Sequence, residues 1–299
     1  MKIKLWFKEI RPKFLLLSVA LVLLGTAISF NDSYFNWLRF FLTMFGLLLA
    51  HTSVNVLNDY FDFKSGIDFE TNRTDFSGGS GILTQGLLEA KSVYRFGLVS
   101  LLAAFPIGIY LTVISGWQLL PLIIVGGLCI YFYTSFLTKW LIGELWAGLG
   151  LGMLPVLGTY YIQAGSYSPD IFIVSLAPFF LTSNLLLLNE FPDFDADKKG
   201  GRYNLVIALG RKKASRLYAL IMAATYLCII FGVILKKMPP LTLISFVSLP
   251  FALKSIFITY KYFDNIKALI PALKFNVITV LATDILLALG YFINSRLNR

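Results

Sequence analysis

Nine of the 16 acidic residues are confined to two short polar stretches of an otherwise apolar chain. Five lie within residues 58–81 and four within residues 189–205. Carboxylates beside apolar segments are costly unless they are solvated, paired or bound to a metal ion. A solvated loop is the simpler explanation of such residues, but their clustering in two places favours a built site.

The two stretches repeat the same order of residue types. Asn58 precedes Asp62 by four residues, and Asn189 precedes Asp193 by four residues. At 3.6 residues per turn, this spacing places an amide and a carboxylate on one face of a helix end. The repeat predicts that two similar halves of the molecule face one shared site. A second aspartate and an arginine then follow in each stretch, namely Asp68 and Arg73 in the first and Asp197 and Arg202 in the second.

The chemistry that these side chains could support is the binding of a metal diphosphate. Asn and Asp oxygens suit Mg²⁺, which binds a few carboxylates together with water and substrate phosphate oxygens. Basic residues stand near both stretches and could face the phosphate oxygens that the metal leaves uncovered. These residues are Lys64, Arg73, Lys139, Lys198, Lys199 and Arg202.

The composition indicates an integral membrane protein. Of the 299 residues, 57% are hydrophobic and only 14% are charged, whereas about a quarter are charged in typical soluble domains. We predict an all-α, polytopic helical bundle that forms a single domain over residues 1–299. A membrane-crossing helix needs roughly 20 apolar residues, and the expected spans are 14–30, 37–57, 93–114, 119–138, 141–162, 171–189, 214–235, 241–260 and 273–293.

The distribution of basic residues predicts the orientation in the membrane. With the N-terminus in the cytoplasm, 21 of the 26 Lys and Arg residues fall on the cytoplasmic side, as the positive-inside rule requires. This rule accounts for the net charge of +10 without a nucleic-acid partner. We therefore expect a multi-pass protein of the cell (inner) membrane with both acidic stretches facing the cytoplasm.

An apolar chamber behind a diphosphate site would suit an isoprenoid diphosphate, whose tail is a hydrocarbon. The chain contains 27 Phe, 15 Tyr and 5 Trp residues. Aromatic faces can stabilise an allylic cation by about 2 kcal/mol when the pair is desolvated. The composition therefore fits a reaction in which a prenyl cation forms away from water.

Several segments resemble one known family. NDYFDFKSGID and NEFPDFDADKKGGR are similar to the two aspartate motifs of the UbiA superfamily of membrane prenyltransferases. The segments HTSVNVLNDYFD and YTSFLTKWLIGELWAGLGLG support this resemblance and favour the MenA-like branch, which prenylates 1,4-dihydroxy-2-naphthoate on the way to menaquinone. The resemblance implies a helical bundle of about nine transmembrane helices around a central chamber, with Mg²⁺ bound between the motifs.

The resemblance also implies roles for individual residues. One departure from the broader family is Gly66, which stands where an aspartate is usual, while the acid is at Asp68, as in the MenA-like spacing. The expected metal ligands are Asn58, Asp59, Asp62, Asp68, Asn189, Asp193 and Asp197. The expected diphosphate ligands are Lys64, Arg73, Lys139 and Arg202, and the expected catalytic residues are Asp62, Asp193, Lys139 and Tyr133.

The resulting prediction is Mg²⁺-dependent transfer of a polyprenyl group from its diphosphate to an aromatic acceptor, with dihydroxynaphthoate favoured. Hydroxybenzoate, homogentisate, haem and a glycerol-phosphate lipid remain open as acceptors. A cation-coupled transporter is the alternative from another class, with Asp284 as the one acid well inside a predicted span. Besides its substrates and the bilayer, no obligate protein partner is evident, and the roles of His51 and Glu144 stay open.

Overall fold

The computed structural model describes residues 2–71, 73–74, 76–135 and 141–297, except for the side chains of residues 2 and 133–135. Throughout these ranges the regular structure is helical. The elements are α1 (Lys2–Glu9), α2 (Pro12–Asn31), α3 (Trp37–Ser65), α4 (Ile67–Glu70), α5 (Ala90–Ser115), η1 (Trp117–Leu119), α6 (Leu120–Ser135), α7 (Gly143–Gly148), η3 (Leu149–Met153), α8 (Leu154–Ala164), α9 (Pro169–Lys199), α10 (Leu205–Leu209), α11 (Arg211–Ile234), η4 (Pro240–Ser248), α12 (Leu249–Tyr262) and α13 (Ile266–Leu297).

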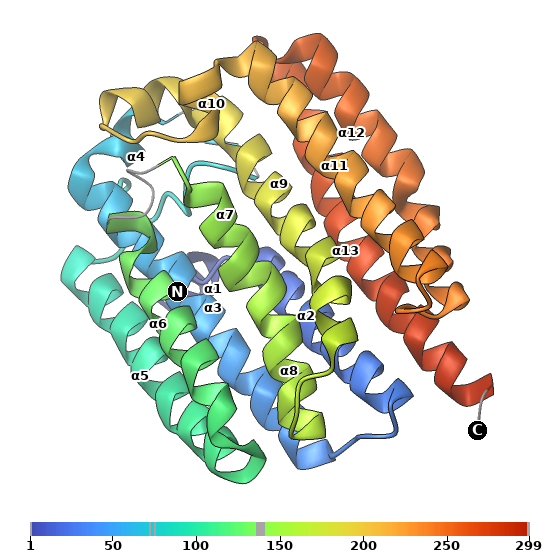
Figure 1. The fold of residues 1–299 in the computed structure, drawn as a ribbon. Helices are drawn as coiled ribbons and strands as arrows, with labels where there is room; N and C mark the ends of the chain where they lie inside the picture. Colours follow the sequence, from blue (N-terminus) through green and yellow to red (C-terminus); the bar gives the residue numbers. More distant parts are fainter. Residues whose placement is uncertain (1, 72, 75, 136–140, 298–299) are drawn as a thin grey trace.

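The predicted membrane bundle is confirmed. Within the described ranges, eight helical segments are long and apolar enough to cross a bilayer, and each overlaps a predicted span. The ninth predicted span, 119–138, coincides with a shorter apolar helix over Trp117–Phe132. The long helices lie side by side with a common tilt (Figure 1), as expected for a multi-pass membrane protein.

The two helices that carry the acidic motifs extend beyond their predicted spans. We expected spans to end at residues 57 and 189, but α3 continues to Ser65 and α9 continues to Lys199. The α3 helix ends where Gly66 adopts a φ of 86°, a left-handed conformation that glycine tolerates. Both motifs therefore stand on rigid helical turns. The ends of α3 and α9 lie with α4 and α10 at one end of the bundle (Figure 1), opposite the C-terminus.

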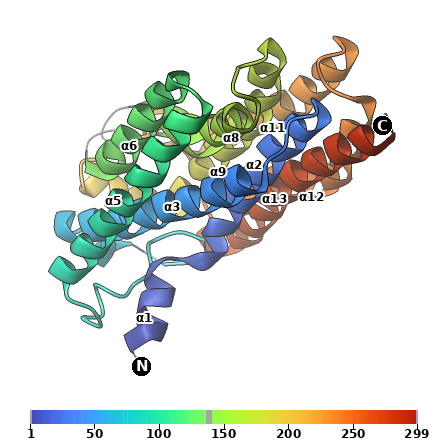
Figure 2. The same cartoon turned by 90° about the horizontal axis from the view of Figure 1, so that it is seen from below.

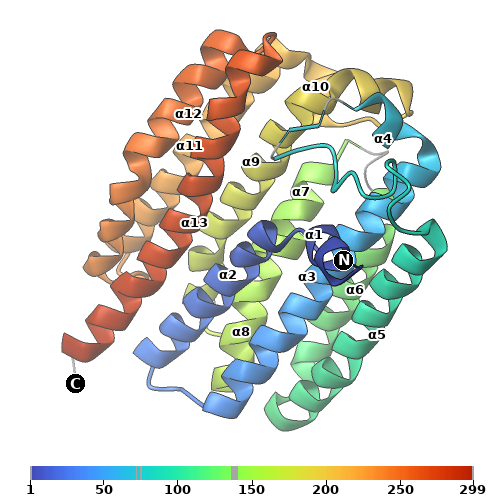
Figure 3. The same ribbon diagram turned by 180° about the vertical axis from the view of Figure 1, so that it is seen from behind.

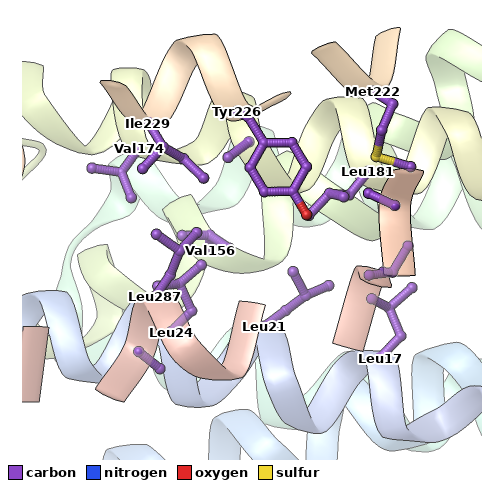
Figure 4. Packing of buried hydrophobic residues seen from close by; sticks show 14 of the residues in the cluster. Leu17, Leu21, Leu24, Val156, Val174, Leu181, Met222, Tyr226, Ile229 and Leu287 are labelled. Carbon is purple, nitrogen blue, oxygen red and sulfur yellow. The ribbon is translucent and has the colours of Figure 1, made fainter. Parts of the chain in front are cut away.

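Buried apolar side chains pack α9 against the helices that surround it. Figure 4 shows Leu21 and Leu24 of α2 beside Leu287 of α13 and Val156 of α8, with Leu181 of α9 close by. Lipid tails are as apolar as these side chains, so close packing, rather than escape from water, stabilises helix contacts in a membrane. The position of α9 thus depends on how well its neighbours fit.

Polar side chains also fix α9 to the C-terminal helices. Asn184 of α9 donates through Nδ2 to the carbonyl of Tyr218 in α11 at 2.9 Å. The Tyr218 hydroxyl reaches Asn276 Oδ1 in α13 at 3.0 Å and Ser255 Oγ in α12 at 2.7 Å. Because buried polar groups in a bilayer need internal partners, this network holds four helices in one arrangement.

Glycine lets α9 and η3 approach each other closely. A Cβ on Gly152 would lie 2.5 Å from the carbonyl oxygen of Pro178 and 3.0 Å from Cα of Phe179. These are backbone atoms of α9, so they cannot move aside without shifting the helix. Small residues at such contacts are a common feature of membrane helix packing.

This contact predicts a stability difference between two identical substitutions. Gly152→Ala should destabilise the protein by about 1–3 kcal/mol, the usual cost of overpacking. Gly127→Ala is the matched control, because a Cβ there meets no described atom within 4 Å. Thermal unfolding in detergent should show a lower midpoint for Gly152→Ala and an unchanged or higher one for Gly127→Ala. Equal midpoints would contradict the close contact.

Candidate active site

The first motif has the helix-face arrangement that its spacing predicts. Asn58 Nδ2 donates to Asp62 Oδ2 at 3.1 Å, one turn along α3. Asp62 is buried, with 8% of its surface exposed. Asp68 follows on α4 and is also buried. Burial, together with the nearby negative charges of Asp62 and Asp59, raises the pKa of Asp68 to about 7.

The second motif lies on α9, where Asn189, Asp193 and Asp197 are spaced four residues apart. Asn189 Oδ1 and Asp193 Oδ1 are buried and have no hydrogen-bond partner among the described residues. An unsatisfied buried oxygen costs about 1–3 kcal/mol, and more when it is charged. Such oxygens call for a ligand that supplies positive charge.

Arg202 joins the two motifs directly. Its Nη1 pairs with Asp197 Oδ1 at 2.9 Å, and its Nη2 pairs with Asp62 Oδ1. Asp197 also accepts from Asn204 Nδ2 at 3.1 Å. Asn204 caps α10 by accepting from the Ile207 amide at 2.9 Å. The guanidinium therefore links α3 to the end of α9.

A polar pocket of about 120 Å³ lies between the motifs. It contains six of the seven predicted metal ligands and one predicted diphosphate ligand. Its lining includes Asn58, Asp62, Asp68, Asn189, Asp193, Asp197 and Arg202, together with Arg11, Glu190, Asn204 and residues 76–79.

An apolar chamber of about 390 Å³ opens from the same place. Arg11, Asn58, Leu186 and Asn189 line both spaces, so the polar pocket stands at the mouth of the chamber. Helices α2, α3, α5, α6, α8 and α9 provide most of the wall. The arrangement provides a polar head site continuous with a hydrocarbon site. Among the described side chains, its aromatic lining includes Phe14, Phe105 and Trp146.

Of the predicted site residues whose side chains the structure describes, three are absent from the linings of both spaces. Asp59 is buried and accepts from the Ser80 amide at 2.8 Å, and it pairs with Arg11 at 3.3 Å. Lys64 is exposed at the end of α3. Arg73 donates to the carbonyls of Gly78, at 2.9 Å, and Asp68, at 3.2 Å, and to the Thr84 hydroxyl.

Arg73 and Asp59 thus organise the glycine-rich segment after α4, which crosses the site end of the bundle (Figure 3). Within this segment Gly78, Gly79 and Gly81 all have positive φ angles. For Tyr133 the structure gives the backbone, at the end of α6, and Lys139 lies outside the described residues. The roles predicted for Asp59, Lys64, Arg73, Tyr133 and Lys139 stay predictions.

Sequence reasoning missed the contribution of the N-terminal segment. Arg11, which joins α1 to α2, donates to Asn58 Oδ1 at 3.4 Å and to Asp59 Oδ1 at 3.3 Å. Ser80 donates to Glu9 Oε2 at 2.7 Å. Burial and the negative charge of Asp59 raise the pKa of Glu9 to about 7. Although α1 projects from the side of the bundle (Figure 2), its end therefore contributes to the site.

Two residues whose roles were left open have structural partners. Glu144 Oε1 accepts from the Leu205 amide at 2.7 Å, at the start of α10. His51 Nδ1 lies 2.8 Å from Ser18 Oγ, and His51 also lines the apolar chamber. Asp284, the acid considered for a transporter, is fully buried on α13 and lines neither space.

The oxygen atoms of the polar pocket are of the kind that binds a hard divalent cation, although the described carboxylates are not arranged in metal-binding geometry. Among the described residues, no group of three or more His, Cys, Asp or Glu side chains has metal-binding geometry. The pocket nevertheless contains carboxylate and amide oxygens of the type that Mg²⁺ prefers, and two of them are buried without partners. Asn58, Asp62, Asn189, Asp193 and Asp197 are the residues that would hold it.

Comparison with known proteins assigns this arrangement to a family. The UbiA prenyltransferase family matches residues 15–278. A 1,4-dihydroxy-2-naphthoate octaprenyltransferase of Bacillus subtilis (strain 168) is 30% identical over 243 residues, which cover 80% of this chain and 77% of that protein. A protein of the same name from Escherichia coli (strain K12) is 24% identical over 304 residues, which cover 97% of this chain and 95% of that protein.

Solved structures agree on the fold. A UbiA homolog from Aeropyrum pernix K1, in its apo form, aligns with a TM-score of 0.74 at 16% identity and covers 94% of this chain and 97% of that chain. A UbiA homolog from Archaeoglobus fulgidus bound to GPP and Mg²⁺ aligns with a TM-score of 0.67 at 15% identity. The alignment covers 95% of this chain and 99% of that chain. From the family match and these similarities, the chain belongs to the UbiA prenyltransferase family.

Proposed function

We propose that this membrane enzyme transfers a polyprenyl group from its diphosphate to 1,4-dihydroxy-2-naphthoate in a Mg²⁺-dependent reaction. The observation that carries the proposal is the continuity of the carboxylate pocket with the apolar chamber at Asn58 and Asn189. A prenyl diphosphate matches this arrangement, because its charged head is joined directly to a hydrocarbon tail. The UbiA homolog from Archaeoglobus fulgidus, bound to GPP and Mg²⁺, supports this ligand and the metal.

The residues of the pocket would hold the head group of the substrate. Asn58, Asp62, Asn189, Asp193 and Asp197 would bind Mg²⁺, which when bound neutralises charge on the departing diphosphate. Arg202 would turn part of its hydrogen-bonding capacity from the carboxylates to phosphate oxygens, which its planar fork suits.

The chamber would protect the reacting carbon from water. Breaking the bond between the prenyl carbon and the diphosphate oxygen leaves an allylic cation, and an electron-rich ring carbon of the acceptor then forms the new C–C bond and loses a proton. Apolar walls exclude water that would otherwise trap the cation. Phe14 and Trp146 belong to the lining of the chamber, and aromatic rings can stabilise a cation that lies over their faces. No covalent bond to the enzyme is needed.

The choice of acceptor is supported by two considerations. Similar proteins from Bacillus subtilis and Escherichia coli are named as dihydroxynaphthoate octaprenyltransferases. In addition, dihydroxynaphthoate carries a carboxylate, and Arg11 and Lys13 line the chamber near its mouth. Electrostatic attraction in this low-dielectric region would hold that carboxylate. The other candidate acceptors are acidic as well, so the named relatives carry the choice of naphthoate among them.

The proposal extends to the whole chain and to its orientation. Residues 1–299 would act as one prenyltransferase domain in the cell membrane. The polar pocket would face the cytoplasm, because 21 of the 26 basic residues then fall on the cytoplasmic side. The bilayer and the two substrates are the partners that the proposal requires.

A panel of acceptors assayed one at a time with purified, lipid-reconstituted protein tests the acceptor. Dihydroxynaphthoate, hydroxybenzoate, homogentisate, haem and a glycerol-phosphate lipid would be offered separately with a radiolabelled prenyl diphosphate and Mg²⁺. The expected result is label in prenylated naphthoate and little in the other products. Preferential labelling of another acceptor would overturn the naphthoate assignment.

A further inference from the structure

One face of α3 carries polar side chains from the carboxylate pocket into the apolar chamber. His51, Asn55 and Asn58 are spaced four and three residues apart, so they share one face of the helix. All three line the chamber. At a rise of 1.5 Å per residue, His51 lies about 10 Å deeper along the helix axis than Asn58. The chamber therefore has a polar position two turns beyond the site proposed for the diphosphate.

The orientation of the His51 ring is fixed by α2. Its Nδ1 lies 2.8 Å from the Oγ of Ser18, and both side chains are buried. Among the described residues, Ser18 Oγ forms no other hydrogen bond. Its hydroxyl proton is therefore satisfied by donating to Nδ1, because a buried donor without a partner is costly.

The second ring nitrogen of His51 opens to the chamber. An unpaired charge in these apolar surroundings is costly, so the imidazole is neutral and has one donor and one acceptor nitrogen. Since Nδ1 accepts from Ser18, Nε2 carries the proton. In the described part of the chain Nε2 has no hydrogen-bond partner, and it is not one of the enclosed polar atoms that lack one. His51 thus presents an N–H donor to the space that it lines.

Other polar side chains deep in the chamber are already satisfied or enclosed. Three threonine hydroxyls donate to main-chain carbonyls, Thr43 to Arg39 at 2.7 Å, Thr159 to Pro155 at 2.6 Å and Thr182 to Leu151 at 3.1 Å. The indole nitrogen of Trp146 has no partner among the described residues, but it is enclosed. The N–H of His51 is therefore the donor that a ligand inside the chamber would meet.

This donor suits the acceptor rather than the prenyl chain, whose hydrocarbon tail has no hydrogen-bonding atom. In the proposed acceptor, the carboxylate and the hydroxyl at the 4-position lie on the order of 5 Å apart by standard bond lengths. A hydrogen bond of about 3 Å at each end extends this span to about 11 Å, which is comparable with the axial separation of His51 and Asn58. Arg11, whose Nη1 lies 3.4 Å from Asn58 Oδ1, would then hold the carboxylate at the mouth.

We propose that His51 is a binding residue for the aromatic acceptor and that its Nε2–H donates to the oxygen of the hydroxyl farther from the carboxylate. Ser18 is the positioning residue, because it sets the tautomer and the orientation of the His51 ring. The ring of the acceptor is held between His51 and Arg11, beside the pocket where the prenyl carbon is released. This inference rests on the proposed function and assigns the depth and orientation of its acceptor.

Two substitutions of His51 separate this role from a structural one. Asn places its amide at the distance of Nδ1 from the backbone and can keep the contact with Ser18, whereas Gln places its amide at the distance of Nε2 and can donate into the chamber. Affinity for dihydroxynaphthoate would be measured on the reconstituted protein with Mg²⁺ and an unreactive prenyl thiodiphosphate. His51→Asn should weaken it by about 10-fold, the loss expected for one hydrogen bond, and His51→Gln by about threefold or less. A purely structural role predicts the opposite order.

A matched acceptor tests which oxygen is bound. 1-Hydroxy-2-naphthoate keeps the carboxylate but lacks the hydroxyl assigned to His51. The wild type should bind it about 10-fold more weakly than dihydroxynaphthoate, whereas His51→Asn should bind both compounds equally, as a double-mutant cycle requires for a direct contact. Thr43→Val is the control, because it removes a chamber hydroxyl that already bonds within α3 and should leave both affinities unchanged.

The outcomes distinguish this inference from the proposed function. A wild type that binds the prenyl thiodiphosphate but neither naphthoate would show that the proposed acceptor is wrong. If the wild type binds dihydroxynaphthoate no more tightly than His51→Asn does, or if His51→Asn retains the preference for the second hydroxyl, the assignment of His51 is overturned and the proposed function stands. Affinity for the prenyl thiodiphosphate should be unchanged in both variants. Its loss in both would show that His51 supports the chamber as a whole, and would likewise overturn the assignment.

Discussion

Asp193→Asn is expected to lower turnover by at least about 10²-fold while leaving the fold intact. Changing a group that merely orients a metal ligand already costs 10- to 100-fold, and Asp193 is proposed to be a ligand itself. Its Oδ1 is buried without a partner among the described residues. The amide has the same shape, but its neutral oxygen binds a hard cation less strongly than a carboxylate oxygen does.

The substitution should not weaken the metal-free protein. Asp193 lies among the carboxylates of Asp62, Asp68 and Asp197, and neutralising one of several close negative charges removes repulsion. The thermal midpoint without Mg²⁺ should therefore be equal to or higher than that of the wild type, whereas the increase on adding Mg²⁺ should become smaller.

Asp195→Asn is the matched control for this experiment. It is the same substitution on the same helix, but the Asp195 side chain is 76% exposed and pairs with Arg211 at 3.0 Å. Exposed pairs of this kind contribute about 0–1 kcal/mol, so activity should stay within about twofold of the wild type. Equal activities for the Asp193 and Asp195 variants would contradict the assignment of Asp193.

Arg202→Gln should have the second large effect, on both stability and activity. The guanidinium pairs with Asp62 and Asp197, and its side chain is only 15% exposed. Removing one partner from a buried ion pair typically costs 3–5 kcal/mol. The loss of a donor that faces the leaving group typically lowers kcat by about 10²–10³-fold.

A double variant separates these two contributions. In Arg202→Gln with Asp197→Asn, one of the two carboxylates left unpaired is removed, so the thermal midpoint should recover in part while activity stays below that of Asp197→Asn alone. Activity equal to that of Asp197→Asn alone would show that Arg202 is needed only for the fold. Arg211→Gln is the control, because Arg211 pairs with the exposed Asp195 and not with a carboxylate of the pocket.

Residues close together in the sequence were the most predictable part of the site. The Asn58 and Asp62 pair needed only the helical repeat, and the two side chains do form a hydrogen bond along α3. The same repeat placed Asn189 and Asp193 on one helix, where both line the polar pocket. The fold class followed from the long apolar runs, because a bilayer leaves few alternatives to helices.

Contacts between distant segments were less predictable. Arg73 has the sequence position of a diphosphate ligand, but its hydrogen bonds go to Gly78, Asp68 and Thr84 within its own segment. The spacing of residues gives no information on which way a long side chain turns in a loop. Asp59 likewise has the sequence position of a metal ligand within the first motif, but its carboxylate accepts from the Ser80 amide and pairs with Arg11.

Arg11 was missed because its charge had a sufficient explanation. A basic residue before the first membrane helix satisfies the positive-inside rule, so no other role was required. A usable signal was the following Pro12, because proline favours the first position of a helix and so places Arg11 just before α2. Only the three-dimensional arrangement shows that Arg11 reaches Asn58 and Asp59.

The two acidic motifs are proposed to form one Mg²⁺-dependent diphosphate site, and a measurement of ligand affinity tests this arrangement. An unreactive prenyl thiodiphosphate would be titrated into the reconstituted wild type and the Asp62→Asn/Asp193→Asn variant, each with Mg²⁺ and with excess chelator. We predict tight binding only to the wild type with Mg²⁺, and at least about 10²-fold weaker binding in the other three cases. Equal affinity with and without Mg²⁺, or an unchanged affinity in the variant, would contradict a shared Mg²⁺ site between the two motifs.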